Sequence, residues 1–289
     1  MEQLVETARI LREELDFRGY IHLKTIPDAA PELLAEAGRL ADRVSINVEL
    51  PTRAGLAKFA PEKDDQRIKI AMADTRAWID TWKDEREKIK STPRFAPAGQ
   101  STQMIVGADE SKDAQILSCS ADLYGSYKLK RVYYSAFSPI PDASKDLPPT
   151  RPPLMREHRI YQADWLWRFY GFGLDDLSHS MEEGMLPLDI DPKLAWALNQ
   201  RAVFPVDVNR APKEMLLRVP GLGTISVNKI LSARRHARLR LEHVGRLCRN
   251  VTKIRPFIET ADWCPTTLTD RADLRDLLAP PAKQLQLPL

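Results

Sequence analysis

The sequence predicts an α/β fold with parallel strands, followed by an all-α C-terminal region. Four short segments before residue 140 have the apolar alternation typical of strands, and helical segments separate them. After about residue 175, apolar residues recur at helical spacing instead. Strands that alternate with helices favour parallel pairing through right-handed crossovers, so we expect one parallel sheet with an open edge.

The expected elements alternate along the N-terminal half of the chain. The strands are residues 20–26, 43–50, 101–107 and 130–137, and the helices are residues 3–17, 30–42, 64–90 and 111–124. Apolar and polar residues alternate in the second strand, which places Ser45, Asn47 and Glu49 on one polar face. That face is either a functional surface or an ordinary solvated side of the sheet.

Composition divides the chain into four expected segments. Residues 1–140 hold the strands, and residues 141–200 hold a proline-rich linker and a helix at 157–169 with many aromatic residues. Residues 201–256 are strongly basic, and residues 257–289 form a C-terminal tail whose end, from residue 279, we expect to fray. Tyr161, Trp165, Trp167 and Tyr170 in the aromatic helix are either core residues or a stacking surface for a base.

Charge is unevenly distributed. The whole chain has a net charge of +3, but residues 201–256 contain 13 Lys and Arg and only three acidic residues. The remainder of the chain holds 30 basic and 37 acidic residues. A local excess of positive charge indicates a polyanionic partner for that segment, and DNA is the partner we expect.

Other chemistry is less favoured by the sequence. There is no apolar run of the roughly 18 residues that cross a membrane, and the N-terminus is acidic and amphipathic, so we expect a cytoplasmic protein. Cys119, Cys248 and Cys264 are widely spaced, without the short spacings that hold a metal or a cluster, so no metal site is expected. No residues stand out as catalytic acids, bases or nucleophiles.

A glycine-containing turn lies within the basic segment. Val219-Pro220-Gly221-Leu222-Gly223 separates two amphipathic segments, the first capped by Asn209 with Pro212 in its first turn, the second running over about 224–235. This pattern predicts a helix-hairpin-helix in which free backbone amides at a helix start face a phosphate. The expected nucleic-acid-binding residues are Gly221, Leu222, Gly223, Thr224, Ser226, Lys229, Arg234 and Arg235. The alternative is an ordinary helical hairpin with a solvated basic face.

The sequence also resembles a known family. The resemblance covers about residues 10–250 and is most specific at residues 44–52 (VSINVELPT) and 94–103 (RFAPAGQSTQ). These blocks, with residues 208–223, resemble radical S-adenosylmethionine proteins of DNA modification or repair, in which a partial (βα) barrel precedes a helix-hairpin-helix. The resemblance implies S-adenosylmethionine and a [4Fe–4S] cluster as cofactors.

The resemblance is incomplete. The family's C-x₃-C-x₂-C loop and its glycine-rich motif are absent, so the four strands correspond to strands three to six and the chain resembles the C-terminal two thirds of the family. A split gene product, a misassigned start and a truncated relative all fit, and a separate chain is a possible source of the remaining strands. By the family pattern the cofactor-binding residues are Asn47, Glu49, Gln103, Ile105 and Val106. An ion pair between Lys24 and Glu49 is the alternative reason for a charge at that position.

Two function classes follow. In the first, the chain is the DNA-binding portion of a radical enzyme whose cluster ligands it lacks. In the second, it is a non-enzymatic module that binds DNA, and the barrel remnant is a scaffold or docking surface.

Overall fold

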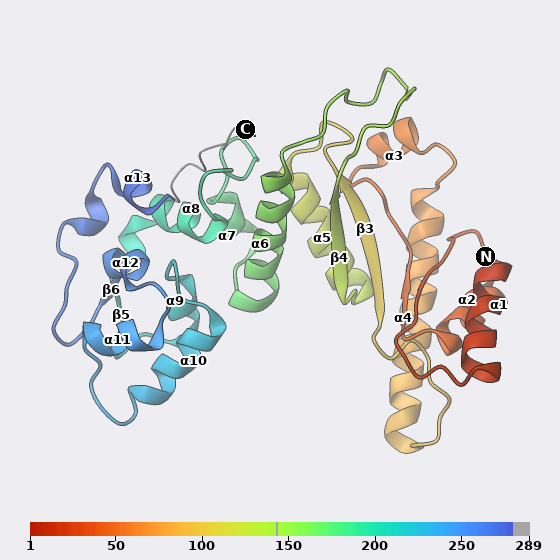
Figure 1. Cartoon of the computed structure of the whole chain (residues 1–289), viewed down its shortest axis with the longest axis horizontal. Helices are drawn as coiled ribbons and strands as arrows, with labels where there is room; N and C mark the ends of the chain where they lie inside the picture. The colour runs from red at the N-terminus through yellow and green to blue at the C-terminus, as the bar shows by residue number, and fades with distance from the viewer. Residues whose placement is uncertain (143, 280–289) are drawn as a thin grey trace, which may run out of the picture. The chain divides into compact units, whose positions relative to one another are not determined.

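The computed structural model describes residues 1–142 and 144–279, which form two compact units (Figure 1). The first unit is Met1–Glu157 and the second begins at His158. The boundary falls within the expected segment 141–200, and its residues 158–200 belong to the second unit together with the expected segments 201–256 and, as far as described, 257–289. Most of the tail that we expect to fray, residues 280–289, lies outside the described residues.

A four-stranded parallel sheet organises the first unit. The strands are β1 (His22–Lys24), β2 (Arg43–Ser45), β3 (Gln100–Val106) and β4 (Arg131–Ala136), and they pair in this order across the sheet. All three pairings are parallel, and that of β3 with β4 is the most extensive. The expected α/β fold with parallel strands is therefore confirmed.

Five α-helices alternate with these strands. They are α1 (Glu2–Arg9), α2 (Pro31–Leu40), α3 (Arg53–Phe59), α4 (Asp65–Lys88) and α5 (Asp113–Tyr127), and a π-helical turn, Ile10–Glu14, continues α1. Figure 1 shows the long α4 beside the sheet. Side chains of α1, α2 and α4, among them Ala8, Leu40 and Ile79, form one core with Leu23 of β1 and Val44 of β2.

The two faces of the sheet differ in character. Met104 and Val106 of β3 and Tyr134 of β4 are buried, whereas Gln103 and Ser135 on the alternate face are partly exposed. Because neighbouring residues in a strand point to opposite faces, one face joins the apolar core and the other is polar. This arrangement differs from the continuous apolar strands of a sheet covered on both sides.

The second expected strand is shorter than the alternation predicts. It ends at Ser45 because the chain bulges: Ile46 N donates to Ser101 O (3.2 Å) and Glu49 N to Gln103 O (3.1 Å). Three steps along this segment therefore match two along β3, and Glu49 has a positive φ of 61°. The bulge breaks the alternation, and Ser45 and Asn47 are buried rather than on a solvated face.

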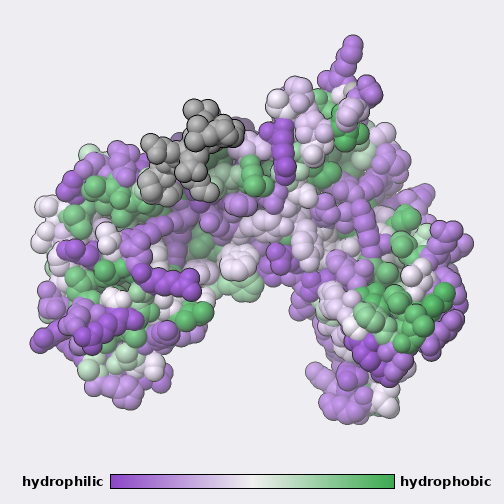
Figure 2. Space-filling view, viewed as in Figure 1, coloured by the Kyte–Doolittle hydropathy of each residue, from purple (hydrophilic) through white to green (hydrophobic). Residues whose placement is uncertain are grey.

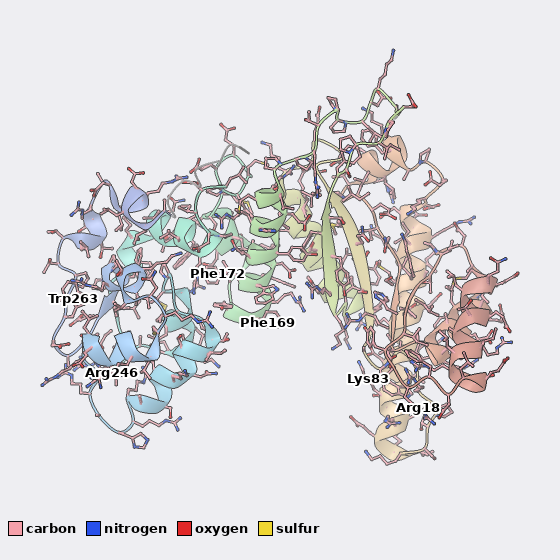
Figure 3. All side chains as sticks on the ribbon, in the orientation of Figure 1. Arg18, Lys83, Phe169, Phe172, Arg246 and Trp263 are labelled. Atoms are coloured by element: carbon pink, nitrogen blue, oxygen red, sulfur yellow. The ribbon has the colours of Figure 1, made fainter. Side chains whose placement is uncertain are left out.

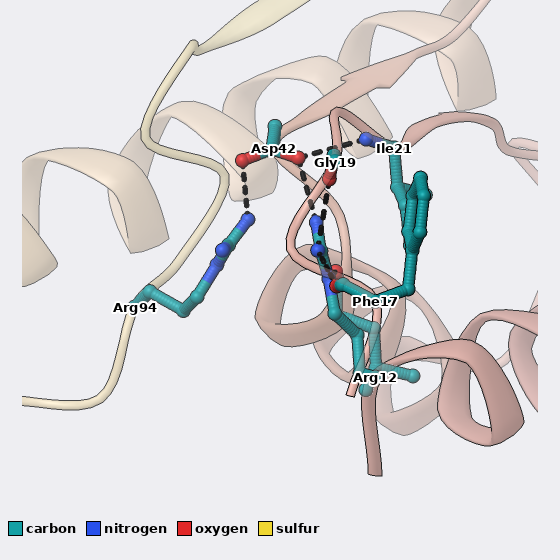
Figure 4. Close-up of polar contacts among 7 residues, drawn as sticks. Arg12, Phe17, Gly19, Ile21, Asp42 and Arg94 are labelled. Carbon is teal, nitrogen blue, oxygen red and sulfur yellow. Dashed lines mark hydrogen bonds and ion pairs between the residues drawn. The ribbon is translucent and has the colours of Figure 1, made fainter. Parts of the chain in front are cut away.

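Asp42, which precedes β2, joins three segments of the first unit (Figure 4). Its carboxylate accepts hydrogen bonds from Arg12 (2.7 Å), from Arg94 and from Ile21 N (2.8 Å). Arg12 also donates to the carbonyl oxygens of Phe17 and Gly19 at 2.6 and 2.9 Å. Burial opposes ionisation, but these donors outweigh it and hold the pKa of Asp42 below its ordinary value.

The second unit is mainly helical. Its α-helices are most of α6 (Leu154–Tyr170), then α7 (Leu174–Ser178), α8 (Pro192–Asn199), α9 (Lys213–Arg218), α10 (Thr224–Ala233), α11 (Leu241–Leu247), α12 (Val251–Ile254) and α13 (Leu274–Leu278). The 3₁₀ turns are Arg201–Val203, Arg255–Phe257 and Leu268–Asp270. In the described part of the chain, no helix is both long and apolar enough to span a membrane.

The expectation of an all-α C-terminal region is wrong in one respect. Two short strands, β5 (Val206–Asp207) and β6 (Ile258–Glu259), form a separate parallel pair. Two-residue strands are too short to produce a periodic signal in the sequence. Beside them, the rings of Phe172, Trp196, Phe204 and Phe257 pack edge to face at centroid distances of 5.3, 6.0 and 5.0 Å. The pairing and these rings fix residues 204–208 and 257–259 in one core.

Replacing Asp42 by Asn should destabilise the first unit by about 2–3 kcal/mol, because hydrogen bonds to a charged group are lost from a largely buried position. The lowered pKa adds stability that is present above the unfolded value of 3.8 and is lost as the pH falls. In urea denaturation, the free energy of unfolding should therefore fall more steeply below about pH 5 in the wild type than in Asp42→Asn. Asp16→Asn, at an exposed ion pair with Arg18, is the control. If Asp42→Asn and the wild type are equally stable, the Asp42 carboxylate does not stabilise the first unit.

Candidate nucleic-acid interface

Helices α9 and α10 are joined by a short turn, residues 219–223, which is the α9–α10 turn below. Leu216 and Leu217 of α9 and Val227 and Ile230 of α10 are buried, as the apolar spacing predicts. Leu222 in the turn is also buried, and its backbone N–H and carbonyl oxygen are both bonded within the chain. The apolar faces therefore point inward and the glycines of the turn remain accessible from solvent.

Backbone amides gather at the start of α10. Leu222 N donates to Val219 O (3.1 Å) and Val227 N donates to Gly223 O (2.9 Å). Among the described residues, no acceptor faces the amides of residues 221 and 223–226. These free donors lie at the positive end of the helix dipole, a combination that suits an anion.

The two glycines of the turn have different roles. Gly221 has φ of +86°, and a Cβ added there would lie 3.0 Å from Cγ1 of Ile254 in α12. Gly223 has φ of −98°, and its added Cβ would lie 3.5 Å from the Tyr170 hydroxyl, an ordinary contact. Backbone geometry therefore requires glycine at position 221, whereas position 223 tolerates a small side chain.

A buried lysine lies beneath the turn. Lys193 of α8 donates hydrogen bonds from Nζ to the carbonyl oxygens of Leu217 (3.0 Å) and Leu222. Burial lowers the pKa of Lys193 to about 7, although the nearby Asp191 carboxylate opposes this shift. Lys193 therefore connects the end of α9 to the turn, and sequence reasoning missed it because a lone lysine in an apolar helix carries no motif.

Asp191 and Lys253 form an ion pair next to Lys193. Asp191 caps α8 by accepting from Leu194 N (2.9 Å), and its other oxygen accepts from Nζ of Lys253 in α12. Burial raises the pKa of Asp191, but the charge and hydrogen bond of Lys253 outweigh it, and the net shift is downward. The pair anchors α12, whose Ile254 packs against Gly221.

The basic residues of the segment 201–256 fall into two groups. Eight are exposed, and Figure 2 shows hydrophilic surface over α11, one of the helices that carry them. The exposed residues are Arg210, Lys213, Lys229, Arg235, Arg238, Arg240, Arg246 and Arg249. The other five, Arg201, Arg218, Arg234, Lys253 and Arg255, are partly buried. In the first group, Arg210 pairs with Asp207 and Arg246 with Glu242. The exposed group is open to a polyanion from solvent, and the partly buried group supports the fold.

Arg234, one of the expected nucleic-acid-binding residues, has a structural role in the second unit. Its guanidinium donates to the carbonyl oxygens of Val208 (3.2 Å) and Ala211 (2.7 Å), so it stabilises the segment before α9. Thr224 and Ser226 lie partly exposed in the first turn of α10, and Lys229 and Arg235 are exposed on the same helix or just after it. Arg246, labelled in Figure 3, extends from α11.

Asn209 does not cap a helix as expected. The N-cap of α9 is Pro212, and the Asn209 side chain instead bonds both backbone groups of Leu239, accepting from its N (2.7 Å) and donating to its O (3.1 Å). The helix therefore begins after Pro212 rather than around it. Asn209 holds the segment after α10 against the segment before α9.

The polar sheet face of the first unit contains some of the expected cofactor-binding residues. Gln103 donates to Ser135 Oγ (3.3 Å) and accepts from Asn47 Nδ2 (3.5 Å), and Ile105 lies on the same face as Gln103. Val106 points to the opposite face and is buried in the core, so its side chain is not available to a ligand on the polar face. Glu49 pairs with Lys63 and, at 3.8 Å, with Lys24. The ion pair between Lys24 and Glu49 that the sequence left open is therefore present.

The cysteines do not fit an iron–sulfur cluster. In the described residues, no three or more His, Cys, Asp or Glu side chains lie close enough together to hold a metal. Burial raises the pKa of Cys119 to about 11 and also raises that of Cys248, which disfavours the thiolate that a metal needs. The residues present here do not provide the ligands of a [4Fe–4S] cluster.

Comparisons with known proteins identify no relative. The chain matches no family model, no curated protein and no solved structure.

Replacing Lys193 by Met tests the buried ammonium group. In the unfolded chain the lysine titrates near 10.5, so between about pH 7 and pH 10 the unfolded chain binds more protons than the folded one, and stability rises with pH. Urea denaturation should show the wild type gaining stability over Lys193→Met between about pH 7 and pH 9. Lys213→Met, at an exposed position, is the control. A constant difference across this range would show that Lys193 has an ordinary pKa.

Proposed function

We propose that this chain binds nucleic acid through α9, the α9–α10 turn and α10, acting as a helix-hairpin-helix on duplex DNA. The observation that carries the proposal is the group of free amides at residues 221 and 223–226, at the start of a ten-residue helix. Phosphate oxygens accept hydrogen bonds from such amides without any contribution from base sequence.

The exposed cations support this proposal. Lys229 and Arg235 lie on or just after the helix that presents the free amides, and Lys213 begins the preceding one. Their charges attract the phosphate backbone over a longer range than hydrogen bonds and make binding depend on salt. Because backbone contacts fix position and not sequence, we expect affinity for duplexes of any sequence.

Two substitutions test the site. Gly223→Asp places a carboxylate among the amides without violating the backbone geometry, and Lys229→Glu reverses an exposed charge. Each should weaken binding to a 20-base-pair duplex about fivefold or more, and Lys229→Glu should reduce the slope of log K against log salt by about one. Fluorescence anisotropy across a salt series measures both.

Lys83→Glu, on α4 in the first unit and labelled in Figure 3, is the matched control, because it changes the net charge equally. It should bind DNA as the wild type does. If Lys83→Glu weakens binding as much as Lys229→Glu, attraction is due to total charge and the α9–α10 turn has no special role.

A second candidate function concerns the first unit. The polar face that carries Gln103 and Ile105, with the buried Asn47 bonded to Gln103, supports a site for a nucleoside such as S-adenosylmethionine on a half (βα) barrel. In that case the chain is the DNA-binding portion of a radical enzyme, and a separate chain brings the cluster ligands and the remaining strands. A non-enzymatic module that binds DNA, with the sheet as a scaffold, is the alternative.

Isothermal titration with S-adenosylmethionine separates the two alternatives. If the polar face is a nucleoside site, the chain should show saturable binding, and Gln103→Leu should weaken it about tenfold, because a hydrogen-bonding amide is lost from the site. Gln115→Leu, on α5, is the control. Absence of saturable binding by the wild type would leave the sheet as a scaffold.

A further inference from the structure

A pocket of about 450 Å³ lies in the second unit beside the α9–α10 turn. Its lining comes from one side of α6 and from the start of α8: His158, Tyr161, Gln162, Trp165, Leu166, Tyr170, Asp191, Pro192 and Lys193. Tyr161 and Trp165 are one helical turn apart, so their rings share a face of α6. The volume is within the range of pockets that hold small organic ligands.

The pocket and the turn share a boundary. Tyr170, which lines the pocket, places its hydroxyl next to Gly223, where an added Cβ would lie 3.5 Å from it. Lys193 also lines the pocket, lies 4.8 Å from the centre of the Tyr170 ring and donates to Leu222 O in the turn. A strand held by the free amides of the turn would therefore lie close to the residues that line the pocket.

The chemistry of the lining suits a planar heteroaromatic group. Trp165 is 54% exposed and offers an indole face, and Tyr161 and Tyr170 add two further rings. Among the described residues, no partner occupies the Tyr170 hydroxyl, the His158 ring or the amide nitrogen of Gln162, whose oxygen accepts from Arg159 (2.9 Å). These groups can donate to or accept from the edge of a base.

Charge in the pocket does not oppose a nucleic acid. The Asp191 carboxylate is paired with Lys253 and caps α8, so little free negative charge faces the pocket. His158 and Lys193 are the remaining ionisable groups of the lining that carry positive charge when protonated. A negatively charged strand can therefore approach without an unpaired carboxylate to repel it.

We propose that this pocket receives one unpaired nucleobase from the strand whose phosphates contact the α9–α10 turn. The proposal rests on the proposed function, because binding of the strand at the turn brings the base to the pocket. A paired base cannot enter, since its edge is occupied and its faces are stacked within the duplex. The aromatic walls replace this stacking, and the free polar groups replace the lost base pair.

Two duplexes of equal length test the pocket. One is a fully matched 20-base-pair duplex, and the other has a central two-nucleotide bubble with 2-aminopurine at one unpaired position. Because each stacked base contributes about 1–3 kcal/mol, the wild type should bind the bubble at least about fivefold more tightly than the matched duplex. Stacking in the pocket should also quench the 2-aminopurine fluorescence of the bubble.

Trp165→Ala and Tyr20→Ala are a matched pair of variants. Both remove exposed aromatic rings, but only Trp165 lines the pocket, and Tyr20 lies in the first unit. Trp165→Ala should abolish both the preference for the bubble and the quenching, and should keep wild-type affinity for the matched duplex. Tyr20→Ala should keep the preference. Lys229→Glu should weaken both duplexes by the same factor, which leaves the preference unchanged.

The outcomes separate the two proposals. No preference for the bubble in the wild type, or a preference that Trp165→Ala retains, overturns the pocket and leaves duplex binding at the turn intact. Failure of the wild type to bind the matched duplex refutes the proposed function and with it the pocket proposal. A preference lost in both Trp165→Ala and Tyr20→Ala is not specific to the pocket lining, and the pocket is again overturned.

Discussion

Lys193 holds its ammonium group under the α9–α10 turn and binds the carbonyl oxygens of Leu217 and Leu222. These two bonds tie the end of α9 to the turn, and among the described residues the amides of residues 221 and 223–226 have no acceptor. Burial lowers the pKa of Lys193, so these bonds offset only part of the loss of solvent for its charged form.

The sheet of the first unit follows a different constraint. Its core side is apolar and packs against α2 and α4, whereas its other side carries amides, hydroxyls and arginine that bond to one another, such as Arg43 with Tyr133 at 3.4 Å. Polar groups that bond mutually need not be covered by further chain, because they satisfy one another and water completes the rest. A sheet built in this way is stable with one covered face, and a ligand on the polar face must compete with these internal bonds.

Elements with strong periodicity were predictable from the sequence, and single buried side chains were not. The four parallel strands and the helices at 65–88 and 224–233 follow from spacing and from glycine and proline positions. The early end of β2 was not predictable, because a bulge at 46–49 depends on hydrogen bonds to β3 rather than on local sequence. Arg234 was assigned to DNA by its charge alone, and only its carbonyl partners reveal a structural role. Lys193 and Asp191 were missed because their partners are distant in the sequence, and only the structure brings them together.

The division of the basic residues into exposed and partly buried groups affects how the second unit would bind a polyanion. If all 13 cations of residues 201–256 were solvated, attraction would be diffuse and any surface of the segment would serve. Five of them are instead partly buried, and Arg218 is typical, since it pairs with Asp176 at 2.9 Å and stacks on Trp196. The remaining charge is carried by exposed residues, among them Lys213, Lys229 and Arg235 on and around the two helices that form the turn. In the proposed complex, these charges attract a strand to this surface, the amides at the start of α10 bind one of its phosphates, and this contact brings a base to the pocket beside Tyr170.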